Sequence, residues 1–138
     1  MNDRLMGTLT GDRAERWGRS YETLIGHVLG LTCAVAGFGI VASGVVDALR
    51  GGPDVLVLGL VGFVVALVGV VGWWFTRLPR QIRILDVFVT VTSSWVLLMF
   101  VGALPYWLTG WIPAFDDAMF EAVSGFTTTG ATVLRPIE

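Results

Sequence analysis

Three long apolar segments constrain this chain more than any other feature of its sequence. They cover residues 24–49, 55–76 and 84–108; the second carries no charge, and the third carries one, Asp86, near its start. A helix that crosses about 30 Å of hydrocarbon, at about 1.5 Å per residue, needs about 20 residues, so each segment is long enough. Because lipid offers no hydrogen bonds to the backbone, helices are the expected form. The sequence therefore predicts an all-α membrane protein with three transmembrane helices.

The composition agrees with this prediction. Hydrophobic residues make up 54% of the 138 residues, charged residues only 14%, and the mean hydropathy is +0.75, whereas soluble domains carry about 25% charge. A net charge of −2 gives no basis for a nucleic-acid partner. The single cysteine, Cys33, excludes an intramolecular disulfide and a CxxC site, and is most simply a small buried apolar residue. Residues 1–22 are polar and of mixed charge, unlike a cleavable signal peptide.

Arginine placement predicts the orientation of the chain in the membrane. Arginines flank the spans at two places, before the first (Arg4, Arg13, Arg16, Arg19) and between the second and third (Arg77, Arg80, Arg83). The first loop has only Arg50, and residues 109–117 have no basic residue. By the positive-inside rule, the N-terminus and the second loop are cytoplasmic and residues 109–117 lie outside. We therefore expect a multi-pass protein of the plasma (inner) membrane, with an aromatic belt at each interface (Trp73 and Trp74 inside; Tyr106, Trp107 and Trp111 outside).

Short connections and small residues predict how the helices pack. The loops at 50–54 and 77–83 are short, so the second and third helices are expected to be antiparallel neighbours. Small residues would let the first helix approach a partner closely (Gly26, Gly30, Gly37, Gly39, Ser43, Gly44). His27 is interpreted as an interfacial residue rather than a proton sensor.

Residues 109–138 have a different pattern. Pro113 suits the first turn of a helix, Asp116 and Asp117 favour a helix start, and Ser124-Gly125 favours a helix end. Apolar residues recur between them at spacings of three and four (Phe115, Ala118, Met119, Ala122, Val123, Phe126). A helix of about three turns is too short to span a bilayer, so we expect a re-entrant segment. Asp116 and Asp117 could alternatively form a cation-attracting ring.

The run that follows, residues 126–133, is uncharged and rich in threonine around Gly130. It is similar to a potassium selectivity filter, in which backbone carbonyls replace the water shell of the ion. Glycine permits the backbone angles that such a strand needs. A simple loop or strand is the alternative interpretation. We expect Glu121 to hydrogen-bond either to the backbone of this run or to a neighbouring helix.

Two stretches together resemble a known family. Residues 83–110, with Leu85-Asp86 at the head and 102–108 at the end, resemble the first outer helix of a Trk-type (TrkH/TrkG-like) potassium uptake transporter. Residues 114–134 resemble its pore helix and filter, and the two preceding helices match an extra pair that many members carry. The chain would then divide into residues 1–82, with the N-terminus and the extra pair, and residues 83–138, the first pore repeat.

The resemblance implies four repeats around one ion path, each with an outer helix, a pore loop and an inner helix. Gly130 would be the filter glycine of the first repeat, and the ion-binding residues would be Thr127, Thr128, Thr129, Gly130 and Ala131. Potassium, the transported substrate, would meet the backbone oxygens of Thr128, Thr129 and Gly130, and no cofactor is expected. A homodimer and a cytoplasmic nucleotide-binding regulatory subunit are implied as partners.

The sequence ends at Glu138, where Pro136-Ile137-Glu138 would lead into the inner helix of this repeat. One filter strand cannot surround an ion, so we expect no conduction by the 138 residues alone. The favoured function is potassium transport as the N-terminal part of a transporter. The alternative is a truncated, non-conducting membrane interaction protein. An intramembrane enzyme is not expected, because the sequence has no HExxH, no Gly-x-Ser-x-Gly and no intramembrane aspartate pair.

Overall fold

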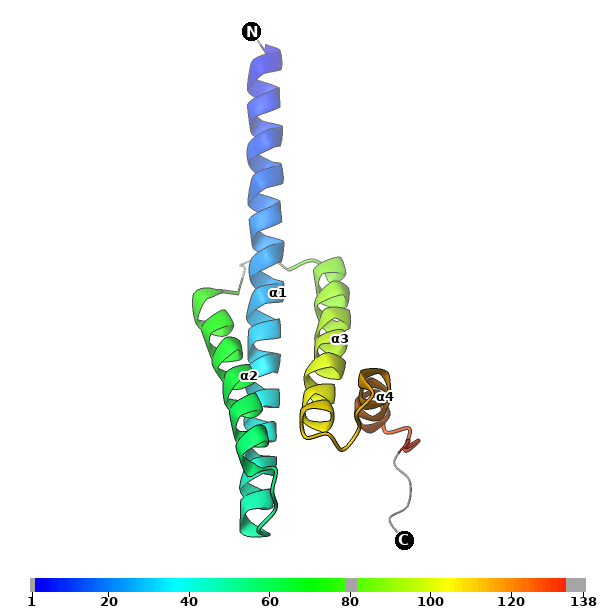
Figure 1. Ribbon diagram of the computed structural model, residues 1–138. Coiled ribbons are helices and arrows are strands. Elements are labelled where there is room, and N and C mark those ends of the chain that lie inside the picture. The colour runs from blue at the N-terminus through cyan, green and yellow to red at the C-terminus, as the bar shows by residue number, and fades with distance from the viewer. Residues whose placement is uncertain (1, 79–81, 134–138) are drawn as a thin grey trace.

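Four helices follow one another in a computed structural model that describes residues 2–78 and 82–133, with side chains from residue 24 onward. They are α1 (Asn2–Leu49), α2 (Val55–Phe75), α3 (Ile84–Leu108) and α4 (Phe115–Phe126) (Figure 1). Arg80, Leu134 and the Pro136-Ile137-Glu138 segment lie outside the described residues, as do the side chains of the arginines before residue 24.

Three of these helices are long and apolar enough to cross a membrane: Leu24–Leu49, Val55–Phe75 and Ile84–Leu108. Large apolar side chains cover their outer faces and are exposed, as for Phe63, Val68 and Phe88. An apolar outer surface of this extent suits hydrocarbon rather than water. The prediction of an all-α, multi-pass membrane protein is therefore confirmed.

Helix α1 lies between α2 and α3 (Figure 1). Helix α2 runs antiparallel to both α1 and α3 (Figure 1). Helix α3 packs mainly against α1 and only slightly against α2. The expected antiparallel arrangement of α2 and α3 is therefore confirmed, but the two are not the main packing partners that the short connection predicted. Residues 76–83 can extend over more than about 20 Å, enough to pass the roughly 10 Å width of α1, so the length of the connection does not force α3 against α2.

Small residues allow the backbones of α1 and α2 to come into direct contact. A Cβ atom added at Gly30 would lie 2.5 Å from the backbone nitrogen of Trp73, and one added at Gly37 would lie 2.6 Å from the Cα of Ala66. Gly69 faces the backbone of Ala34 in the same way. The packing role predicted for Gly26, Gly30, Gly37 and Gly44 is confirmed, whereas Gly39 has open space around it.

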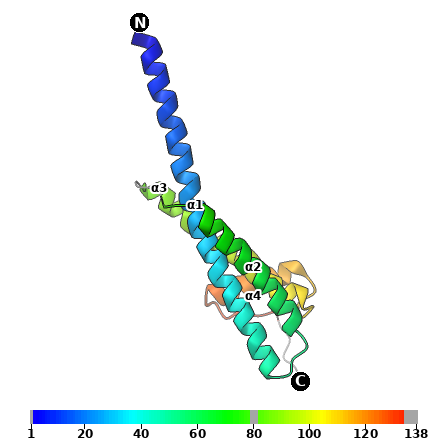
Figure 2. The same ribbon diagram turned by 90° about the vertical axis from the view of Figure 1, so that its left-hand side faces the viewer.

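Helix α1 begins at Asn2, far before its apolar part, so the polar N-terminal residues belong to the same helix as the first apolar segment. That segment contains no proline, and its three glycines are separated, so nothing in it forces the helix to stop. Both views show this half of α1 projecting beyond the other helices (Figures 1 and 2).

Candidate ion-binding loop

Helix α4 packs against the last turns of α3 rather than extending away from it. Ala103 of α3 is fully buried in a cluster with Ile112, Ala118 and Ala122. At Gly102 the helices are so close that an added Cβ would lie 2.5 Å from the Phe126 ring. The absence of a side chain at Gly102 therefore makes room for α4.

Aromatic contacts extend this packing deeper along α3. The ring of Phe115 stacks on Phe100 at 6.4 Å and meets Trp107 edge-on at 5.5 Å. Phe100 lies about two turns, roughly 12 Å, before the end of α3 at Leu108. Helix α4 thus lies beside the last part of the third apolar segment, as Figure 1 shows.

The N-terminus of α4 differs in one detail from the sequence-based prediction. The helix begins at Phe115, with Ala114 as its N-cap, so Pro113 precedes the cap and is not in the first turn. Pro113 therefore stiffens the approach to the helix instead of occupying its first position. Asp116 and Asp117 are in the first turn, as predicted, and both are exposed.

The C-terminus of α4 also differs, because the helix runs through Ser124 and Gly125 to Phe126. Its end is a Schellman motif, in which Thr128 N–H donates to Gly125 O at 3.3 Å and Thr129 N–H donates to Ser124 O at 3.0 Å. The left-handed position of this motif usually holds glycine, but here it holds Thr128, with φ of 55°. Gly125 is therefore a helical residue, and Thr128 is a strained one.

Two side chains of α4 hold the far end of the loop. The Ser124 hydroxyl donates to the carbonyl oxygen of Ala131. The Glu121 carboxylate accepts from the Thr132 hydroxyl, with 3.0 Å to each oxygen, and from Val133 N–H at 3.1 Å. The prediction that Glu121 hydrogen-bonds to the backbone of this run is confirmed, whereas the role of Ser124 was missed, because only its place at a helix end was considered.

The carbonyls of the loop fall into two groups. The Thr127 carbonyl accepts from the Thr128 hydroxyl at 2.7 Å, and the Ala131 carbonyl accepts from Ser124. The carbonyls of Thr128, Thr129 and Gly130 accept no hydrogen bond from any residue that the structure describes. Gly130 has φ of 73°, which few other residues tolerate. Three consecutive carbonyl oxygens are thus available as ligands.

A small cavity of about 220 Å³ separates the loop from α4, lined by polar groups of both segments. Its lining includes Thr128, Gly130 and Ala131 among the five predicted ion-binding residues, but not Thr127 or Thr129. The hydroxyls of Thr127 and Thr129 instead face each other at 2.8 Å. Within the described residues, no group of three or more His, Cys, Asp or Glu side chains is placed to hold a metal ion. The loop therefore offers uncharged carbonyl and hydroxyl oxygens as possible ligands for a cation.

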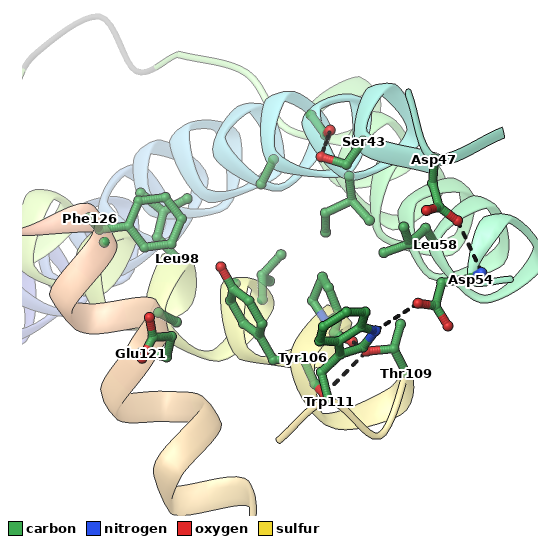
Figure 3. A pocket seen from close by; sticks show the side chains of 18 of the residues that line it. Ser43, Asp47, Asp54, Leu58, Leu98, Tyr106, Thr109, Trp111, Glu121 and Phe126 are labelled. Carbon is green, nitrogen blue, oxygen red and sulfur yellow. Dashed lines mark hydrogen bonds between the residues drawn. The ribbon is translucent and has the colours of Figure 1, made fainter. Parts of the chain in front are cut away.

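A larger groove of about 1030 Å³ lies between α1, α3 and α4, and its walls are mostly apolar (Figure 3). At one end the indole N–H of Trp111 donates to the Asp54 carboxylate at 2.7 Å, while Asp47 accepts from Asp54 N–H at 3.0 Å. This contact joins the α1–α2 turn to the α3–α4 connection. The sequence carried no periodic signal for it, because it links two loops across 57 positions.

Helices α1 and α2 form a hairpin, and His27 lies at the end of this hairpin opposite its turn. Its ring nitrogen Nδ1 lies 3.1 Å from the carbonyl oxygen of Thr76, and the centre of its ring lies 5.8 Å from that of the Trp73 ring. Cys33 is a half-buried free thiol within the first apolar segment.

Comparison with known proteins finds similarity to potassium uptake proteins. The Trk system potassium uptake protein TrkG of Escherichia coli K12 is 39% identical over 69 residues, which is 48% of this chain and 14% of TrkG. TrkI of Halomonas elongata is 37% identical over 87 residues, 62% of this chain and 18% of TrkI. TrkH of E. coli K12 is 39% identical over 75 residues, 52% of this chain and 15% of TrkH.

The chain spans less than a fifth of the length of these curated relatives. No family model matches it, and no solved structure matches it significantly. The similarity covers about half of the chain and recurs among several uptake proteins of the same name. This chain is therefore a sequence relative of the Trk system potassium uptake proteins.

Proposed function

We propose that residues 83–138 form the first pore repeat of a Trk-type potassium uptake transporter, of which this chain is the N-terminal part. In this proposal α3 is the outer helix, α4 is a re-entrant pore helix, and residues 127–131 are one strand of the selectivity filter. Residues 1–82 supply the cytoplasmic N-terminus and the two extra transmembrane helices. The observation that carries the proposal is the set of three consecutive carbonyls, at Thr128, Thr129 and Gly130, that accept no hydrogen bond from the described part of the chain.

Carbonyl oxygens suit an alkali cation because they replace water ligands without adding a net charge. The C-terminal end of α4 lies directly before these carbonyls, and the partial negative charge of a helix C-terminus favours a cation there. The packing of α4 along the last turns of α3 supports a re-entrant position. Thr127 and Ala131 remain in the proposed ion-binding set, although their carbonyls already accept hydrogen bonds from side-chain hydroxyls.

The orientation and the partners belong to the same proposal. By the positive-inside rule, Arg77 and Arg83 support a cytoplasmic α2–α3 connection in the inner membrane, with Trp111 and the α3–α4 connection outside. The likeness to Trk proteins adds a homodimer and a cytoplasmic nucleotide-binding regulatory subunit.

The test is potassium uptake by a bacterium that lacks its own uptake systems. We expect the full-length product of the gene to restore growth at low potassium, and Gly130→Ser to reduce uptake at least tenfold, because serine resists the φ of 73°. Gly59→Ser is the matched control, since Gly59 has open space around it. Uptake unchanged by Gly130→Ser would contradict the filter assignment.

Expression of the 138 residues alone separates the two functions considered. Rescue by the 138 residues alone would contradict the proposed architecture, because one strand would then suffice. If neither form restores growth although both are present in the membrane, potassium transport is wrong and a membrane interaction protein is favoured.

A further inference from the structure

We propose that Glu121 and Ser124 are positioning residues for the carbonyl ligands, and that their hydrogen bonds to the loop set its discrimination between potassium and sodium. This inference rests on the proposed function. Glu121 and Ser124 are three positions apart in α4, so both side chains leave the same face of the helix. That face is turned toward residues 131–133 of the loop.

The Glu121 carboxylate makes a stronger contact than a neutral acceptor would. It receives the Thr132 hydroxyl on both of its oxygens and Val133 N–H on one of them, at 3.0–3.1 Å. Hydrogen bonds to an ionised acceptor are roughly twice as strong as neutral ones. Glu121 is half-buried, and Ser124 is only 6% exposed. The Ser124 contact is therefore partly shielded from competing water, whereas the Glu121 contacts lie in an exposed part of the loop.

These contacts fix one end of the free carbonyl group, and the Schellman motif fixes the other. Thr128 is held by its N–H bond to Gly125, and Ala131 is held through its carbonyl by Ser124. The Schellman bond from Thr129 N–H to Ser124 O also holds Thr129, so only Gly130 lies between the anchored residues. The direction of the Gly130 carbonyl consequently depends on where Ser124 and Glu121 hold the residues that follow.

The number, spacing and flexibility of the carbonyls are the properties through which a filter distinguishes ions of different radius. Loss of Glu121 removes its hydrogen bonds to Thr132 and Val133 and so weakens the hold on this end of the loop, which lets the carbonyls move closer to a smaller ion. The expected effect is a change in selectivity with less change in the amount of protein in the membrane. A residue that only stabilises the fold would lower abundance without changing the ratio between ions.

The experiment measures potassium and sodium uptake by the full-length product of the gene carrying Glu121→Ala, Glu121→Gln or Ser124→Ala, each normalised to membrane abundance. We expect Glu121→Ala to lower the potassium-to-sodium ratio about tenfold. Glu121→Gln, which keeps one acceptor oxygen, should lower it about threefold. Thr92→Val is the control, because it removes an exposed hydroxyl of α3 that donates to the Phe88 carbonyl within the same helix, and it should leave the ratio unchanged.

A wild-type ratio in both Glu121→Ala and Ser124→Ala, at normal abundance, overturns the inference while the transport function stands. If Glu121→Ala does not reach the membrane, Thr132→Val removes the hydroxyl from the other side of the same contact and is expected to lower the ratio; an unchanged ratio there overturns the inference.

Hydrogen exchange of the Val133 amide provides a readout that does not depend on transport. We expect faster exchange in Glu121→Ala than in the wild type or Thr92→Val. Equal exchange rates overturn the positioning contact itself. If the wild-type protein takes up no potassium while exchange still accelerates, the transport function is wrong and the contact is purely structural.

Discussion

The α1–α2 hairpin and the α3–α4 unit are held together in different ways. In the hairpin, glycines let two backbones touch, as at Gly69 against Ala34. In the α3–α4 unit, aromatic rings fill the space between the helices, and polar side chains hold the loop, as at Phe115 and Glu121. Close contact between backbones thus stabilises the α1–α2 hairpin, whereas contacts of side chains stabilise the α3–α4 unit and its loop.

This difference follows from what each region must do in lipid. Apolar side chains gain little by leaving lipid for a helix interface, so close van der Waals contact between small residues is a main source of association. In the proposed re-entrant position, the backbone groups of the loop would need partners, and Ser124 and Glu121 supply some of them. The two regions should therefore respond to opposite kinds of substitution.

We expect the largest effect on stability at Gly69, where the backbones of α1 and α2 are too close to admit a side chain. In Gly69→Ala, the new Cβ would lie 2.7 Å from both the Cα of Ala34 and the carbonyl carbon of Cys33. Backbone atoms cannot rotate away, so we expect a loss of about 3 kcal/mol in stability, the upper part of the range for overpacking. The midpoint of heat-induced aggregation in detergent measures it.

Gly59→Ala is the control for this substitution, since it adds the same methyl group to the same helix in open space. An equal change in the two variants would show that helix propensity, and not contact between α1 and α2, determines the result.

A smaller effect is expected at the contact that joins the two regions. Trp111→Phe keeps the apolar ring but removes the N–H that Asp54 accepts at 2.7 Å. A hydrogen bond to a charged group contributes up to about 1.5–3 kcal/mol, and exposure to water reduces this, so we expect a loss of about 1 kcal/mol. Chemical-denaturant unfolding of Trp111→Phe, Asp54→Ala and the double variant measures the coupling between them; additive losses would contradict a direct contact.

The smallest expected effect has the opposite sign. Thr128→Gly places glycine at the left-handed position of the Schellman motif and relieves a strain of about 1–2 kcal/mol. Glycine loses about 0.5–1 kcal/mol through its greater freedom in the unfolded chain, so a net gain of about 0.5–1 kcal/mol is expected in the same unfolding experiment. Thr127→Gly is the control, because Thr127 has φ of −84° and no such strain to lose; stabilisation by both variants would contradict this explanation.

Much of the architecture could be predicted from composition and spacing. The three apolar segments and the α4 helix are recovered almost to the residue, because lipid requires long apolar helices and a three- or four-residue spacing indicates a helix. The bond from Glu121 to the loop was one of the two partners predicted for it, because Glu121 has an unfavourable acidic neighbour at Asp117 and needs another contact.

The features that could not be predicted are of two kinds. Some depend on contacts between distant segments, and others are backbone conformations that the residue type disfavours. Thr128 adopts a conformation that its own side chain disfavours, so propensity pointed to Gly125 instead. The bond between Trp111 and Asp54 joins two distant loops, and the placement of α3 against α1 depends on a connection that allows either side. The ion-binding assignment of residues 127–131 stays a prediction.

Glu121 lines both the small cavity behind the loop and the large groove between α1, α3 and α4 (Figure 3). Glu121 is thus part of the wall of two separate spaces. A molecule that fills the groove changes the room available to the side chain that holds Thr132 and Val133. Occupancy of the groove and the shape of the loop are consequently not independent variables.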